Sequence, residues 1–488
     1  MIRALGYPAD RSTSRAACRP HLSRRPVRAR TRPPHHPRRS MAGRRVGKLA
    51  LLVGLFALLL GGLTACEARV TGTPHSGITA PEVFYLSPHG DKSGPANKAP
   101  FHLVAKDIRV RDNTGSGDHR LTIDLRGAGG SVRLWIKSGR NCEGTDTHVV
   151  CRLQGWYDSW VQSDRVYPTA TKKGKAGDSA TVDFTFSAKD GKKITGHTRV
   201  VVGEPVVQLQ VQKAIKGAEP GAGVSTAVAV RNTGEVPVRG LGLLIHAGDS
   251  SFRQRYSNCR YPPQMKGREA ICAFPDLRIE PGETVLVRPT LPLRTGKVKI
   301  FSEIRQEAWP LDVGPAKDSA VPDNGDKGAG PALEATAAPK GTGGTFAGGV
   351  QRVPVSLDLR SDYQVTASEL HVGEKRELHL TVRDNGPGDP GGIGHLLFTP
   401  PPGAVVREQP MEEIDDGVYE PGCDLKDGTY ECDRVLSYVS PGNSRVLDFT
   451  LDLPQPGTGH VAFRMETLET GGLDPNLDDN SAEVIVLP

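Results

Sequence analysis

Six of the eight cysteines lie in three local pairs, and cysteines so spaced can form disulfides or hold a metal ion. The pairs are Cys142 and Cys151, Cys259 and Cys272, and Cys423 and Cys432. Their separations of nine and thirteen residues fit no zinc knuckle. The alternatives are disulfides in an oxidising compartment or reduced, buried pairs in the cytosol. The export signal described below favours the disulfides.

The sequence of residues 422–436 predicts that the last pair faces across a β-hairpin. Asp427 and Gly428 suit a two-residue type I′ turn, because both positions of that turn need positive φ angles. Folding the chain there places Cys423 opposite Cys432 in a non-hydrogen-bonded pair, whose Cα atoms lie about 4.5 Å apart. A disulfide can bridge that distance. We therefore predict three disulfides, each within its own domain.

Two stretches resemble catalytic motifs but lack essential residues. Asn113-Thr114-Gly115-Ser116 has asparagine in place of the aspartate of the aspartic-protease D-T-G-S motif. Gly248-Asp249-Ser250 resembles the first block of GDS-type hydrolases, but the later blocks do not follow within that domain. The fourteen histidines show no metal-ligand spacing. We expect no enzyme and no cofactor, with an exported hydrolase as the distant alternative.

An aromatic-rich insert at about residues 154–175 is the candidate ligand site. It contains Trp156, Tyr157, Trp160 and Tyr167. Exposed on a loop, these side chains would form a binding platform, for example for cell-wall glycan. The alternative, which we favour, is that they cap the core at the end of a domain.

A cluster of acids and amides near the C-terminus is a second, weaker candidate. Asp474, Asn476, Asp478 and Asp479 offer the oxygen ligands that Ca²⁺ prefers. Such side chains more often form turns by bonding to the nearby backbone. We favour a turn before the last strand and expect no metal.

The first 66 residues predict export and attachment to a membrane. Residues 1–40 are a basic extension without apolar periodicity, and residues 41–66 have the charged and apolar regions of a signal peptide. That signal ends in Leu63-Thr64-Ala65-Cys66, which resembles the bacterial lipobox, where the cysteine receives a diacylglycerol. The alternative is an uncleaved transmembrane anchor. Both place the protein on the outer face of the cytoplasmic membrane or on the bacterial cell surface.

The net charge of +7 comes from the N-terminal extension. Residues 1–48 carry thirteen arginines and one lysine against one aspartate, so the remaining chain is acidic at −6. A basic patch for nucleic acid is therefore absent from the sequence after residue 48.

Alternating apolar residues divide the rest of the chain into three β-rich blocks. A tether at 67–99, in which residues 83–86 could pair as an edge strand, precedes a first block at 100–204. In that block Val182, Phe184 and Phe186 alternate with polar residues. A second block spans 205–312 and a third spans 353–488. Between them, residues 313–352 are rich in Gly, Ala, Pro and Thr, which predicts a flexible linker.

The second and third blocks share a repeated pattern. The turn at 230–234 matches that at 382–386, and a Pro-Gly turn at 279–282 matches that at 439–442. With the cysteine hairpin and a closing D-P-N-x-x-D-N turn, the pattern resembles the Ig-like repeats of bacterial surface proteins of the conserved-repeat or CARDB (cell-adhesion-related) type. The first block departs from it by its aromatic insert.

This resemblance implies an all-β chain of three Ig-like antiparallel β-sandwiches in tandem, after an N-terminal signal or anchor. It carries no catalytic residues. It implies an adhesive, structural or protein-interaction role with envelope or surface proteins as partners. A lipoprotein that binds cell-wall carbohydrate through the aromatic insert is the main alternative.

Overall fold

The alternating apolar pattern forms β-strands almost throughout. The computed structural model describes residues 77–88, 104–106, 119–136, 141–153, 166–187, 193–316, 319, 321–322, 324–339, 341–433, 439–465 and 473–488. Helix in these residues is confined to the 3-10 turns η1 (Pro263–Met265) and η3 (Leu477–Asn480). No helix of this described part has the length and apolar character that crossing a membrane needs. Cys66 and the predicted signal lie outside the described residues.

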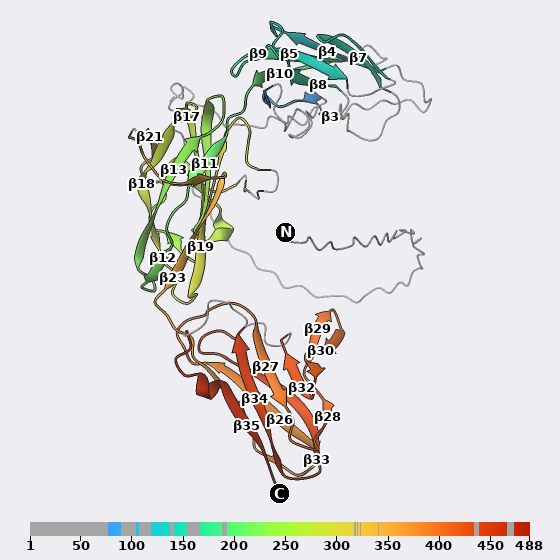
Figure 1. The fold of residues 1–488 in the computed structure, drawn as a ribbon, viewed down its shortest axis with the longest axis vertical. Coiled ribbons are helices and arrows are strands. Elements are labelled where there is room, and N and C mark those ends of the chain that lie inside the picture. Colours follow the sequence, from blue (N-terminus) through green and yellow to red (C-terminus); the bar gives the residue numbers. More distant parts are fainter. Residues whose placement is uncertain are drawn as a thin grey trace, which may run out of the picture. The chain divides into compact units, whose positions relative to one another are not determined.

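The first domain is a six-stranded sheet covered by a two-stranded ribbon (Figure 1). Its strands are β1 (Gly77–Thr79), β2 (Val83–Leu86), β3 (Val104–Lys106), β4 (His119–Arg126), β5 (Val132–Ile136), β6 (Cys142–Gly144), β7 (His148–Leu153), β8 (Val166–Ala170), β9 (Ser179–Ser187) and β10 (Lys193–Val202). The sheet has the order β2-β10-β9-β4-β7-β6, and the ribbon pairs β5 with β8. Val182, Phe184 and Phe186 are buried with Leu134 of the ribbon, so the predicted alternation forms this core.

The second domain is a full sandwich of two sheets. Its strands are β11 (Val207–Gln210), β12 (Ile215–Ala218), β13 (Gly223–Asn232), β14 (Val238–His246), β15 (Ser251–Phe252), β16 (Cys259–Tyr261), β17 (Glu269–Ile279), β18 (Thr284–Arg294), β19 (Phe301–Pro310), β20 (Asp326–Lys327), β21 (Glu334–Ala337), β22 (Phe346–Ala347) and β23 (Val350–Leu357). One sheet runs β15-β18-β13-β11-β22 with β21 also on β18, and the other runs β12-β23-β19-β14-β17-β16-β20. Val230 and Leu243, one from each sheet, pack in a common core.

The segment predicted as a flexible linker is instead part of this second sandwich. Strands β20, β21 and β22 pair with the edge strands β16, β18 and β11, respectively. Leu333 within it is 3% exposed and belongs to the core. The final strand β23 pairs with β19, so the second domain continues to Leu357. The prediction was wrong because backbone pairing to existing edges, rather than apolar periodicity, orders these small residues.

The third domain is also a two-sheet sandwich. Its strands are β24 (Tyr363–Ala367), β25 (Leu370–His371), β26 (Gly373–Asp384), β27 (Gly394–Thr399), β28 (Val405–Glu408), β29 (Met411–Asp415), β30 (Val418–Pro421), β31 (Asp424–Lys426), β32 (Thr429–Cys432), β33 (Ser444–Leu453), β34 (Gly457–Met465) and β35 (Ser481–Leu487). The sheets run β24-β26-β33-β28 and β25-β35-β34-β27-β32-β31. Leu380 and Phe449 of the first sheet pack against Phe398 of the second.

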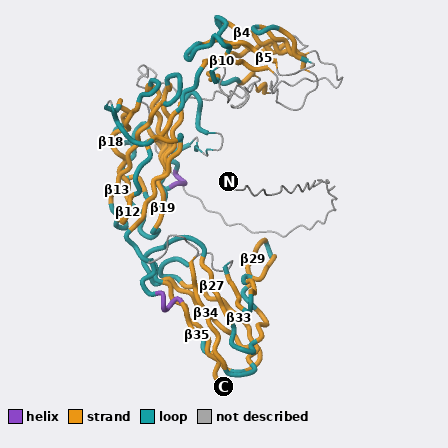
Figure 2. Tube along the Cα trace, viewed as in Figure 1, coloured by secondary structure: helices purple, strands orange, loops and turns teal. Residues whose placement is uncertain are grey.

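The expected antiparallel arrangement needs one correction, because each domain contains a parallel pair. Strand β2 pairs in parallel with β10, β12 with β23, and β25 with β35. In the second and third domains the first segment of the chain crosses from one sheet to the other. Strands β11 and β12 lie in different sheets of the second domain, and β24 and β25 lie in different sheets of the third. This crossing explains the parallel pair, and the tandem of such domains is Ig-like. Figure 2 shows strands and connecting loops along the described chain, broken only by short helical turns in purple.

Candidate functional site

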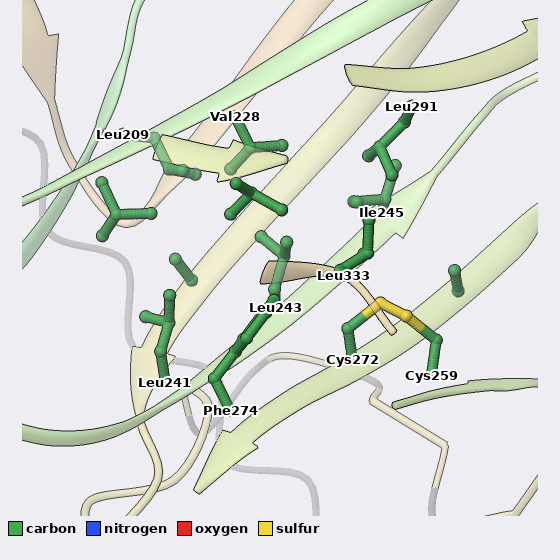
Figure 3. Packing of buried hydrophobic residues seen from close by; sticks show 14 of the residues in the cluster. Leu209, Val228, Leu241, Leu243, Ile245, Cys259, Cys272, Phe274, Leu291 and Leu333 are labelled. Carbon is green, nitrogen blue, oxygen red and sulfur yellow. A yellow bond between two sulfur atoms is a disulfide. The ribbon is translucent and has the colours of Figure 1, made fainter. Parts of the chain in front are cut away.

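The three predicted cysteine pairs are all bonded in the structure. Their Cα atoms lie 4.0, 3.9 and 4.0 Å apart for Cys142–Cys151, Cys259–Cys272 and Cys423–Cys432. Figure 3 shows the second of these disulfides among the apolar side chains of its sandwich. The bridges therefore belong to the domain cores and stabilise the fold rather than act in chemistry.

The last hairpin has the predicted turn and register. Asp427 and Gly428 have φ angles of 49° and 81°, as a type I′ turn requires. Asp424 pairs with Glu431, so Cys423 and Cys432 follow as the next facing positions. The residues of this turn thus fix the geometry of the disulfide.

The predicted aromatic platform lies mostly outside the described residues. Tyr167 is described and sits half-buried on β8, where its ring meets that of Trp135 edge-on at 5.2 Å. Burial raises the pKa of the Tyr167 hydroxyl. Trp135 is 40% exposed. Trp156, Tyr157 and Trp160 fall in the undescribed segment, so the platform stays a prediction.

The acidic cluster near the C-terminus forms a turn in the structure. Asp474 Oδ1 accepts a hydrogen bond from Asn476 N at 3.0 Å, and its Oδ2 accepts from Asn480 Nδ2 at 2.9 Å. Oδ2 also accepts from the Tyr363 backbone N at 3.1 Å, which ties the turn to β24. Among the described residues, no group of three or more His, Cys, Asp or Glu side chains could hold a metal ion. Asp478 and Asp479 lie beside this turn on η3.

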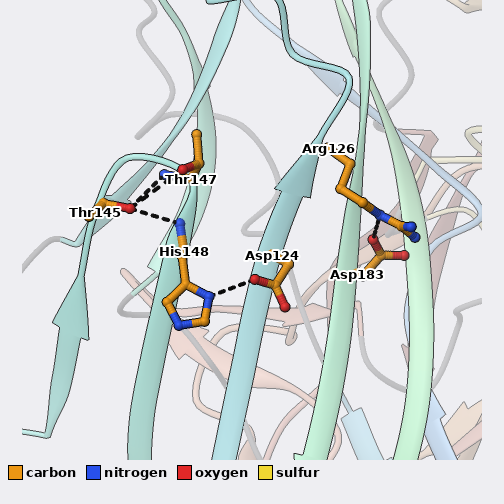
Figure 4. A network of polar contacts seen from close by, with 6 residues as sticks. All are labelled: Asp124, Arg126, Thr145, Thr147, His148 and Asp183. Atoms are coloured by element: carbon orange, nitrogen blue, oxygen red, sulfur yellow. Dashed lines mark hydrogen bonds and ion pairs between the residues drawn. The ribbon is translucent and has the colours of Figure 1, made fainter.

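A polar row on the first domain is a set of cross-strand pairs rather than a catalytic site. Figure 4 shows His148 Nδ1 and Asp124 Oδ1, which lie 2.6 Å apart, and the ion pair of Arg126 with Asp183. Thr145 Oγ1 accepts from His148 N at 3.1 Å. Asp183 raises the pKa of the Arg126 guanidinium by hydrogen bond and charge. Solvent screens exposed pairs of this kind, so they contribute little to stability.

The third sandwich carries an exposed hairpin that sequence reasoning missed. Strands β29 and β30 pair with each other and with no other strand of the described chain, and they project from the domain (Figure 1). Met411, Ile414, Val418 and Tyr419 are exposed on it, with Tyr419 at 57%. Exposed apolar residues gathered in this way mark interaction surfaces.

The same hairpin is strongly acidic. Residues 408–425 contain seven acids and no lysine or arginine. This charge run between two glycine-containing turns is the signal that could have located the hairpin in the sequence. The combination of apolar and acidic side chains is suited to a partner that offers both an apolar contact and positive charge.

A groove of about 690 Å³ separates the base of the hairpin from the outer face of the sheet. Strands β26 and β33 form its floor, and residues 408–413 form one wall. Its lining includes five carboxylates, from Glu377, Glu408, Glu412, Glu413 and Asp448. The lining also includes the cation of Arg445 and the ring of His379, whose Nδ1 lies 2.7 Å from Asp448 Oδ1. The groove is therefore acidic.

The groove exists because β28 leaves the sheet early. This strand pairs with β33 through Val405, Val406 and Glu408. Pro410 then leads the chain out into β29, and Gly422 N donates to Pro410 O at 2.7 Å to close the base of the hairpin. The rest of β33 is left without a strand on that side among the described residues.

No protein-family model matches the chain, and no curated protein sequence matches it. Among solved structures it is similar to the Escherichia coli adhesin FdeC, with 12% identity, a TM-score of 0.20, and coverage of 81% of this chain and 90% of that one. It is also similar to the D00-D0 domain of intimin, with 8% identity, a TM-score of 0.18, and coverage of 58% and 100%. At such TM-scores these similarities carry no argument about function, and the fold rests on the sheets and cores described above.

Proposed function

We propose that this chain is an extracytoplasmic interaction module that is tethered to a membrane at Cys66. Its third sandwich recognises an envelope or surface protein through the β29–β30 hairpin and the adjoining groove. The disulfides of all three domains support a location in an oxidising compartment.

The observation that carries this proposal is the exposure of large apolar side chains on a hairpin outside the core. Leaving apolar area in water forgoes about 25 cal/mol per Å² of favourable burial free energy. Met411 and Tyr419 contribute nothing to the core of the sandwich, since the core is formed by other residues. A protein partner that covers them would recover that free energy.

Capture of partners from the native envelope tests the proposal. The double change Ile414→Ser and Tyr419→Ser should abolish capture without altering thermal unfolding, because neither side chain packs in the core. Ile485→Ser is the matched control, as Ile485 is exposed on β35 of the same sandwich. Undiminished capture by the hairpin variant would show that recognition lies elsewhere.

The tether has its own test. Cys66→Ser should abolish metabolic labelling with a lipid precursor and release the protein into the medium. If the unlabelled variant stays in the membrane fraction, the segment is a transmembrane anchor instead.

Glycan binding through the first domain is the second candidate, favoured by the exposed side chain of Trp135, whose ring meets that of Tyr167 edge-on. Trp156→Ala with Trp160→Ala should then remove binding to purified cell-wall glycan. Retained binding would exclude the aromatic insert as its site.

A further inference from the structure

Strands β18 and β33 hold the same place in consecutive sandwiches. Gly282 N donates to Asn232 O at 2.8 Å in the second, and Gly442 N donates to Asp384 O at 2.8 Å in the third. Counting from these paired turns, Leu286 of β18 corresponds to Val446 of β33. The two edges can therefore be compared residue by residue.

In the second sandwich this edge is covered by the chain itself. Strand β21 pairs antiparallel with β18, so that Thr336 faces Leu286 and Glu334 faces Arg288. Ala338 N continues the ladder by donating to Thr284 O at 2.8 Å. The backbone of Thr284, and by alternation that of Leu286, therefore points toward the covering strand.

In the third sandwich the corresponding edge is open among the described residues. Asp384 N donates to Asn443 O at 3.1 Å, which fixes the phase of the β26–β33 ladder. Alternation then directs the backbone N–H and C=O of Val446 and Asp448 away from β26 and into the groove. Val446 is 51% exposed. Within the described part of this domain, the edge offers a set of strand hydrogen bonds that no other strand takes up.

The surroundings of the edge specify the charge of a suitable strand. Glu412 and Glu413 on the hairpin wall and Glu377 on the floor line the groove beside this edge, where the acids outnumber the one arginine, Arg445. A strand with lysine or arginine at alternate positions would place these cations on the outer, acidic face. An acidic strand would meet repulsion there.

We propose that the open edge of β33 binds an extended, basic segment of a protein partner as an added β-strand. The segment would take the position that β21 takes on β18. This inference rests on the proposed function and specifies how the same surface would recognise its partner. Backbone hydrogen bonds would supply the pairing, and the acidic groove would supply the selectivity.

The test uses the full chain and two synthetic peptides, the basic KTKTKTK and the acidic ETETETE. We expect the basic peptide to bind at least tenfold more tightly, with binding weakened by salt. Single-residue hydrogen exchange should show the Val446 amide becoming protected on binding. The Arg445 and Leu447 amides, which face β26, should be protected with and without peptide.

Two variants separate strand pairing from charge attraction. Val446→Pro removes the N–H that points into the groove and should weaken basic-peptide binding at least tenfold, whereas Val446→Thr should bind as the parent does. Equal affinity for both peptides, or unchanged Val446 exchange on the parent chain, overturns the inference whether or not the proline variant folds. The proposed function would survive that result if the hairpin variant with both Ile414→Ser and Tyr419→Ser still lost its envelope partner.

Discussion

Asn232 and Asp384 occupy the same position in the second and third sandwiches, yet their side chains make different hydrogen bonds. Asn232 Oδ1 accepts from Gly234 N at 2.9 Å, while its Nδ2 donates to the Val236 and Ile279 carbonyls, both at 2.9 Å. Asp384 Oδ1 accepts from Gly386 N at 3.0 Å in the same manner. Its buried Oδ2, in the place of the amide nitrogen, has no hydrogen-bond partner among the described residues.

Burial raises the pKa of Asp384 to about 6 from its ordinary value of 3.8. The nearby charges of Asp389 and Asp362 raise it further, while hydrogen bonds from the Gly386 and Asp362 backbone lower it. The folded domain therefore binds a proton more tightly than the unfolded chain does. Its stability should fall by at most about 3 kcal/mol as the pH rises from about 4 to about 6, and should then level off.

Replacing Asp384 with Asn should remove this pH dependence. Above pH 6 the variant should be more stable than the parent by about 1–3 kcal/mol, because it supplies an uncharged donor where a buried carboxylate stands. The measurement is the unfolding free energy of the third sandwich between pH 4 and pH 8. Asn232→Asp is the reciprocal control and should destabilise the second sandwich at neutral pH. If the unfolding free energy changed equally with pH in the parent and in D384N, the pH dependence would not come from Asp384.

Leu333 should anchor the segment that covers the edges of the second sandwich. Leu333→Ala should destabilise that sandwich by about 2–5 kcal/mol, the range for a buried leucine. Val313→Ala, at an exposed residue that precedes the same segment, should change stability by less than about 0.5 kcal/mol. The measurements are the unfolding free energy of each variant and its rate of cleavage in limited proteolysis. A flexible linker would give the two variants the same stability and the same cleavage.

The sequence predicts well what is determined locally. The Asp427-Gly428 turn sets its hairpin register, and alternation such as that of Val182 and Phe184 marks which side chains enter a core. The covering segment was missed because Leu333 is a lone apolar residue among small ones, and its strands are ordered by edges far away in sequence. The groove was missed because it depends on where β28 stops, at Glu408 before Pro410.

The disulfide of the third sandwich should act within its own domain. Changing Cys423 and Cys432 together to serine should lower that sandwich's stability by about 2–3 kcal/mol, because the closed loop is short. The second sandwich should unfold as before. Non-reduced peptide mapping of the exported parent should recover the 423–432 bridge. A cross-link between cysteines of different domains would refute the independence of the three sandwiches.

Site-specific photo-crosslinking on intact cells tests the central claim most directly. A photoreactive residue at position 419, in place of Tyr419, should give a discrete adduct with an envelope or surface protein. Its yield should fall when Glu412 and Glu413 are both changed to Gln, which keeps shape and removes charge. The same probe in place of Ile485 should give no such adduct. An adduct of equal yield at both positions, or none at position 419, would contradict recognition by the third sandwich's hairpin.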